Sequence, residues 1–140
     1  MEVMYKTTGT ATGGREGQAS IKDGGLDVRL TPPKELGGPG GDGTNPEQLF
    51  ACGYSACFLG AMQFVGGQEG IKVPAETTVT ATVALGKRDD GEGFTIAVDL
   101  VVDIPGVDKA QAEELVGKAH VVCPYSYATK GNISVSTALA

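Results

Sequence analysis

The sequence contains no run of basic residues. Among its 140 residues, 17 Asp and Glu outnumber 11 Lys and Arg, so the formal net charge is -6 and the isoelectric point lies near 4.7. Binding to phosphate needs a basic patch, and this charge balance therefore disfavours nucleic acids and anionic membrane surfaces as partners.

Long apolar runs are scarce too. The first residues, MEVMYKTTGT, lack the charged region and apolar stretch of a signal peptide, and nothing approaches the roughly 18 apolar residues of a membrane span. We therefore expect a cytoplasmic protein without a membrane partner. The content of 41% hydrophobic and 20% charged residues is typical of globular proteins, and the length predicts a single domain over residues 1–140.

The chain has only three cysteines and one histidine. An odd number of cysteines argues against a secreted disulfide scaffold and leaves at least one thiol that packing, metal binding or reactivity must explain. His120 and Cys123 could supply two metal ligands, and Cys57 a third. A structural zinc site needs four, so we expect no bound metal or other cofactor.

Alternating apolar residues and turn residues predict an α+β fold. Two alternating runs flank Asp89-Asp90-Gly91, which indicates a long hairpin. Asn45 and Pro46 favour a helix start, with Asn as N-cap and Pro at the first helical position. The prediction comprises strands within 1–12, 18–22, 26–30, 76–88, 94–104 and 132–138, helices over 46–65 and 108–122, and loops over 31–44 and after Pro124.

The predicted helix 46–65 carries apolar or small residues on nearly every face. Its sequence, PEQLFACGYSACFLGAMQFV, has no charge after Glu47, so we expect it to be buried almost all round. In a chain of this size, such a helix indicates either a central element of the fold or a subunit interface.

The three cysteines differ in whether their positions indicate a structural or a reactive thiol. Cys57 is either a buried structural thiol or a reactive one, because free Cys is among the most buried residue types. Cys52 precedes it by five positions, about 140° around a helix, so the two do not form a CxxC pair, and we interpret Cys52 as a packing residue. Cys123 ends a predicted helix, a position compatible with partial exposure and movement.

Two charged residues remain ambiguous when taken singly. Arg15 lies on a glycine-bracketed turn, where most arginines are only solvated. Glu47 lies near the positive end of the helix dipole, where a negative charge is stabilising, so its presence needs no catalytic role as an explanation. The GGPGGDGT stretch lacks the GK[ST] ending of a phosphate-binding loop.

Three stretches taken together change this interpretation: TGGREG, NPEQLFACGYSACFLGAM and HVVCPYSYATKGNISV. They closely resemble the signature segments of the organic hydroperoxide resistance (Ohr) family, within the OsmC-like superfamily. The resemblance implies an α+β fold of two antiparallel sheets around a buried central helix, in an intertwined homodimer. The departures are Tyr127 and Lys130, where typical members have Asn and Arg, and their effect on loop contacts and substrate shape stays open.

The resemblance also implies an activity, a dithiol-dependent peroxidase of organic hydroperoxides. Cys57 matches the peroxidatic cysteine and Cys123 the resolving one, whereas Cys52 matches no catalytic position. Arg15 and Glu47 match the family's charged partners. The implied reductant is an external dithiol of the lipoyl type or a lipoylated protein. The alternatives are an OsmC-like peroxidase with another peroxide preference and a non-catalytic binding or redox-sensing domain.

Physical chemistry adds expectations about mechanism. An unperturbed cysteine is only a few per cent thiolate at neutral pH, so Arg15 against Cys57 would activate it, with Glu47 orienting the guanidinium. An apolar channel would favour alkyl or lipid hydroperoxides. Its predicted lining residues are Phe50, Phe58, Met62 and Tyr125.

Overall fold

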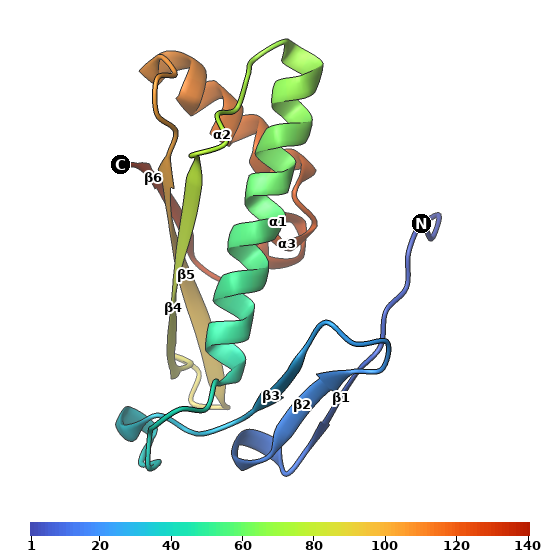
Figure 1. Ribbon diagram of the computed structural model, residues 1–140. Helices are drawn as coiled ribbons and strands as arrows, with labels where there is room; N and C mark the ends of the chain where they lie inside the picture. Colours follow the sequence, from blue (N-terminus) through green and yellow to red (C-terminus); the bar gives the residue numbers. More distant parts are fainter. The chain divides into compact units, whose positions relative to one another are not determined.

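The computed structural model describes residues 1–140 and divides into two compact units, residues 1–49 and 50–140. Figure 1 shows the elements of both. The first unit holds a small antiparallel sheet of three strands in the order β1-β2-β3. The three predicted N-terminal strands are thus confirmed, although the first is shorter than the extended segment we expected. Their bounds are β1 Gly9–Thr12, β2 Gln18–Ile21 and β3 Asp27–Arg29.

Two short 3-10 helices complete the first unit. The helix η1 (Gly14–Glu16) connects β1 to β2, and η2 (Lys34–Leu36) lies inside the predicted loop 31–44. A single 3-10 turn fits between the prolines and glycines of that loop because it needs only one turn of hydrogen bonds. A parallel bridge between Leu30 and Thr44 joins the two ends of the loop.

The second unit is built on a three-stranded sheet of order β4-β5-β6. The strands β4 (Thr78–Lys87) and β5 (Phe94–Asp103) form the predicted antiparallel hairpin, whereas β5 and β6 (Val135–Leu139) run parallel. The expectation of two antiparallel sheets is therefore wrong for this sheet, which is mixed. The reason is the long helical connection from β5 to β6, since a crossover of this kind returns the chain in the same direction.

Three α-helices belong to the structure. The long helix α1 (Pro46–Glu69) extends four residues beyond the predicted end, and it stops before Gly70, whose φ of 70° suits a left-handed C-terminal cap. The second helix, α2 (Lys109–Val122), begins after Asp108, whose carboxylate accepts hydrogen bonds from the backbone of Ala110 and Gln111, as predicted.

The segment after Pro124 is a helix rather than the predicted loop. It forms α3 (Pro124–Thr129), with Pro124 in its first turn. Proline ends α2 because it lacks an N–H group, but its fixed φ is well suited to the first position of a new helix. The same residue therefore closes one helix and opens the next.

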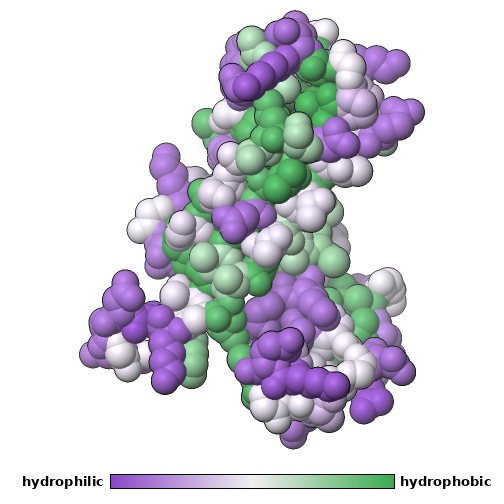
Figure 2. Space-filling model, turned by 90° about the vertical axis from the view of Figure 1, so that its left-hand side faces the viewer, coloured by the Kyte–Doolittle hydropathy of each residue, from purple (hydrophilic) through white to green (hydrophobic).

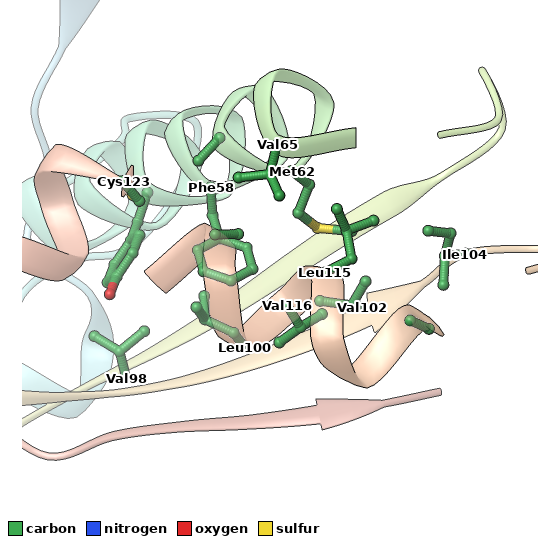
Figure 3. Packing of buried hydrophobic residues seen from close by; sticks show 14 residues of the cluster. Phe58, Met62, Val65, Val98, Leu100, Val102, Ile104, Leu115, Val116 and Cys123 are labelled. Atoms are coloured by element: carbon green, nitrogen blue, oxygen red, sulfur yellow. The ribbon is translucent and has the colours of Figure 1, made fainter. Parts of the chain in front are cut away.

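The core of the second unit lies between α1, α2 and β5 (Figure 3). On β5, Val98, Leu100 and Val102 alternate toward the core, as a half-buried strand requires. The α-helices cover them with the following buried residues: Tyr54, Phe58, Ala61, Met62 and Val65 from α1, and Ala112, Leu115, Val116 and Ala119 from α2.

The expectation that α1 is buried almost all round is wrong for the single chain. A face marked by Cys52, Ala56, Gly60 and Phe64 is exposed, and Phe64 retains 56% of its accessible surface. Figure 2 shows the molecule from the left-hand side of Figure 1, where further apolar side chains lie at the surface. The helix packs on one side only, so a single chain leaves part of its apolar surface uncovered.

The helix α1 is also long and apolar enough, by length and composition alone, to cross a membrane. We expected from the sequence that no stretch would approach the length of a membrane span, and that expectation is corrected here. The mean hydropathy of α1 is high although the helix contains glycine and serine. Helices in the core of proteins meet the same criterion, and one such helix is weak evidence of a span.

Candidate active site

Two thiols meet in the second unit. Cys57 lies on α1 and Cys123 between α2 and α3, and the Cys123 thiol donates a hydrogen bond to Cys57 Sγ at 3.5 Å. A disulfide needs about 2.05 Å between the sulfurs. The reduced pair is therefore within about 1.5 Å of bonding distance, although 66 positions separate the residues in the sequence.

Backbone contacts fix the position of Cys123. Its N–H donates to the carbonyl of Ala119, which closes α2, and its own carbonyl accepts from the N–H of Tyr127, which starts α3. The side chain is completely buried, whereas Cys57 is half-buried. The expected partial exposure of Cys123 is therefore wrong, because α3 folds over the position that a loop would have left open.

The surroundings of Cys57 do not favour its thiolate within the unit. Burial raises the pKa of the thiol, and neighbouring Cys123 raises it further, while a hydrogen bond from the backbone of Tyr125 lowers it. The net direction is upward, because loss of water disfavours the charged form. A reactive thiolate at Cys57 thus needs a positive charge, which neither Cys123 nor Tyr125 supplies.

Arg15 and Glu47 form a two-pronged ion pair within the first unit. Arg15 Nη1 and Nη2 donate to Glu47 Oε2 and Oε1 at 2.8 and 2.6 Å. The hydrogen bonds from Arg15 hold the pKa of Glu47 below its usual range, and Glu47 raises the pKa of Arg15. This fork fixes the plane of the guanidinium, whose side chain stays 41% exposed and can offer its remaining donors.

The turn that carries Arg15 depends on Gly17. A Cβ at this position would lie 1.8 Å from the carbonyl oxygen of Thr12, which no side chain could tolerate. This close approach lets η1 form directly between β1 and β2, and it directs Arg15 toward Glu47 in the first turn of α1.

Of the four predicted lining residues, the structure brings two together. Phe50 and Tyr125 have ring centroids 5.7 Å apart, and Tyr54 lies within 5.8 Å of both. Tyr125 fits here because Gly53 leaves room, since a Cβ on Gly53 would lie 3.1 Å from the Tyr125 hydroxyl.

The other two predicted lining residues lie elsewhere. Phe58 and Met62 are completely buried in the core of the second unit, and Phe58 packs against the His120 ring at 4.6 Å. Their side chains thus offer no free surface to a substrate in the single chain, whereas Tyr125 keeps 38% of its surface.

Cys52 is exposed in the single chain, so it does not pack within its own fold as the sequence interpretation expects. Its position about 140° around the helix from Cys57 places it on the outer face of α1. The chain presents no group of three His, Cys, Asp or Glu side chains that could hold a metal ion.

The sequence interpretation missed a hydrogen-bonded cluster beside the thiols. His120 bonds to Ser126 and Thr137, and Ser126 bonds to Tyr54. The sequence alone suggests His120 only as a possible metal ligand. The available signal was spacing, because His120 and Ser126 each stand three positions from Cys123, and Tyr54 stands three from Cys57.

Comparison with known proteins defines the class of protein to which this fold belongs. The family model described as OsmC-like protein matches residues 38–138. An organic hydroperoxide resistance protein of Elizabethkingia anophelis superposes with a TM-score of 0.93 at 47% identity, over 100% of this chain and 99% of the other. The corresponding protein of Legionella pneumophila gives 0.93 at 42% identity, over 99% of each chain.

A curated relative supports the narrower assignment. The organic hydroperoxide resistance protein of Xanthomonas axonopodis pv. citri is 54% identical over 99% of this chain and 96% of its own length. The chain therefore belongs to the organic hydroperoxide resistance family of OsmC-like proteins. The α+β class expected from the sequence is confirmed, with the correction of the β5–β6 pairing described above.

Proposed function

We propose that this protein is a cysteine-based peroxidase that reduces organic hydroperoxides to alcohols. The observation that carries the proposal is the 3.5 Å contact between the reduced thiols of Cys57 and Cys123. The organic hydroperoxide resistance of its relatives supports the same substrate class. A half-buried thiol beside a buried one matches the needs of a nucleophile and a resolving partner.

The reaction proceeds in three balanced steps. The Cys57 thiolate attacks the terminal peroxide oxygen, the O–O bond breaks, and a proton released on thiol ionisation returns to the alkoxide, so an alcohol leaves and Cys57 becomes a sulfenic acid. The Cys123 sulfur then attacks Cys57 Sγ, and the hydroxyl leaves as water with the thiol proton of Cys123. Finally, an external dithiol of the lipoyl type, free or on a lipoylated protein, reduces the disulfide by exchange.

Activation of Cys57 requires a cation, and Arg15 is the proposed source. Arg15 is held by Glu47, which lies ten positions before Cys57 on the continuous helix α1. A rise of 1.5 Å per residue separates these two helix positions by about 15 Å. An arginine bound to Glu47 is therefore better placed to serve the Cys57 of a second chain.

A homodimer with shared active sites satisfies this requirement. Two α1 helices that cross antiparallel at a two-fold axis would bring Glu47 of each chain near Cys57 of the other. The apolar face of α1 that one chain leaves uncovered, marked by Cys52, Ala56, Gly60 and Phe64, fits such an interface. We propose an intertwined cytoplasmic homodimer in which Arg15 and Glu47 act in trans.

Mixing two inactive variants tests the shared site. We expect Arg15→Ala and Cys57→Ala each to lose activity as homodimers. Unfolded together and refolded in equal amounts, they should recover about a quarter of wild-type activity per chain, because half of the dimers then contain one intact site out of two. Refolded wild type supplies the reference value, and refolding of each variant alone supplies the baseline.

Mixtures that stay at this baseline, although heterodimers are demonstrated by differently tagged chains, would contradict the trans arrangement. Sedimentation provides an independent check. A stable monomer with full activity would exclude a site that needs two chains.

Catalytic turnover is the direct test of the proposed function. With dihydrolipoamide in excess, we expect the protein to consume many equivalents of tert-butyl or cumene hydroperoxide per chain, and to act more slowly on hydrogen peroxide. The preference follows from apolar contacts with the alkyl group, worth about 0.8 kcal/mol per methylene. We place the substrate beside Phe50 and Tyr125, which retain exposed or partly exposed surface near Cys57.

The same assay distinguishes an enzyme from a redox sensor. A sensor would consume about one equivalent of peroxide per thiol pair and then stop, even with dithiol present. Consumption that ends after one equivalent would therefore overturn the proposal, whereas faster turnover of hydrogen peroxide would contradict only the substrate preference.

A further inference from the structure

A continuous set of hydrogen bonds links the helices that carry the two thiols to one another and to β6. The two ring nitrogens of His120 on α2 bond to the hydroxyls of Ser126 on α3, at 2.9 Å, and of Thr137 on β6, at 2.7 Å. The Ser126 hydroxyl also lies 2.9 Å from the Tyr54 hydroxyl on α1. Tyr54 and Ser126 are buried and His120 is half-buried.

The placement of this network relative to the cysteines is regular. Tyr54 stands three positions before Cys57, which puts both on nearly the same side of α1. His120 stands three positions before Cys123, and Ser126 three positions after it. The bond between His120 and Ser126 therefore braces the junction of α2 and α3 at the position of Cys123, and the bond from Ser126 to Tyr54 joins that junction to the helix of Cys57.

Hydrogen bonds matter here because packing on one side of the network is incomplete. A cavity of about 580 Å³ borders Tyr54, His120 and Ser126. On the other side, the Phe58 ring packs against the His120 ring. Side chains next to a cavity lose contacts that would otherwise hold them in place, so the polar bonds must fix the geometry of the junction.

The protonation state of His120 suits this bridging role. Burial lowers the pKa of its ring, which favours the neutral form. A neutral imidazole has one donor and one acceptor nitrogen, so it can accept from one hydroxyl and donate to the other. Both nitrogens are then satisfied without placing a charge beside the thiols.

We propose that Tyr54, His120 and Ser126 are positioning residues that hold Cys123 against Cys57 for formation of the disulfide. The inference rests on the proposed peroxidase function and concerns its second step. In that step the Cys123 sulfur bonds to Cys57 Sγ as water leaves, in competition with a second hydroperoxide that oxidises the sulfenic acid to sulfinic acid and is itself reduced to an alcohol. A fixed approach at 3.5 Å makes the intramolecular reaction the faster one.

Single-turnover measurements on Tyr54→Phe test this role. The substitution removes only the hydroxyl that joins α1 to α3. With one equivalent of cumene hydroperoxide, we expect peroxide consumption at the wild-type rate and disulfide formation slowed about fivefold to tenfold. The reason is the loss of the buried hydroxyl that bonds to Ser126 and, at 3.4 Å, to Thr129. With excess peroxide, mass spectrometry should show a larger fraction of Cys57 as sulfinic acid. Ser126→Ala, which removes the shared hydroxyl, should slow disulfide formation at least as much.

Tyr127→Phe is the matched control, because Tyr127 is 80% exposed on α3 and loses the same hydroxyl. We expect it to match wild type in both steps. Unchanged disulfide formation in Tyr54→Phe and Ser126→Ala would overturn the inference while the peroxidase function stands, as would equal slowing of both steps. Wild type that consumes no hydroperoxide would instead overturn the proposed function, and this inference with it.

Discussion

Cys57→Ser is expected to abolish peroxide reduction. A serine hydroxyl stays protonated at neutral pH and is a much weaker nucleophile than a thiolate, so the rate should fall by at least about a thousandfold. The substitution replaces one sulfur atom at a half-buried position and should leave the fold intact. Steady-state consumption of cumene hydroperoxide with dihydrolipoamide measures the loss.

The two other cysteines supply controls for that experiment. Cys52→Ser changes a thiol that is exposed in the single chain and lies on the α1 face proposed as the dimer interface. Turnover should stay within about twofold of wild type, because serine has nearly the same volume as cysteine. Cys123→Ser should still reduce one equivalent of peroxide but fail to form the internal disulfide. Turnover that survives in Cys57→Ser would overturn the mechanism and favour a binding or sensing role.

Arg15→Gln is expected to have the second largest effect. Burial raises the pKa of Cys57 in the second unit, so the proposed arginine must offset this penalty and bind the peroxide oxygens. Without it, the thiol pKa should be higher than in wild type, and less thiolate should be present at neutral pH. We expect the second-order rate constant with cumene hydroperoxide to fall about a hundredfold, as for loss of one charged transition-state donor.

Thiol alkylation as a function of pH measures the same change directly. In wild type, rapid alkylation of Cys57 should persist to lower pH than in Arg15→Gln. The sign follows from charge, since removal of a cation disfavours the thiolate. Both proteins should also carry Cys52→Ser, so that alkylation of this second free thiol does not obscure the titration of Cys57.

Arg88→Gln is the matched control for Arg15→Gln. Arg88 also pairs with a carboxylate, that of Asp90, and it lies in the turn between β4 and β5. We expect neither the titration nor the rate to change. If Arg15→Gln behaved in the same way as Arg88→Gln, Arg15 would have no part in activating the thiol.

Stability should respond little to either arginine substitution. The Arg15–Glu47 pair is partly exposed, and ion pairs of this kind contribute about 0–1 kcal/mol. Loss of activity in Arg15→Gln with unchanged thermal unfolding would therefore separate a role in chemistry from a role in folding.

Local signals in the sequence predicted most of the secondary structure. Asn45 and Pro46 indicated the start of α1, Asp108 that of α2, and the alternation around Asp89-Asp90-Gly91 the β4–β5 hairpin. Each of these signals acts over a few residues, because caps and turns satisfy backbone groups close in the sequence. The α3 helix escaped prediction because Pro124 both ends one helix and starts the next.

The sequence by itself thus determined α1, α2, the hairpin, the family and the residues to test, since these depend on short-range patterns and on recognisable motifs. Only the tertiary structure decided that β6 runs parallel to β5, that Cys123 is buried, and that its sulfur lies 3.5 Å from that of Cys57. It also decided that Tyr54, His120 and Ser126 form one network. Contacts between residues so far apart depend on how the elements pack, and packing is a property of the whole core rather than of any local pattern.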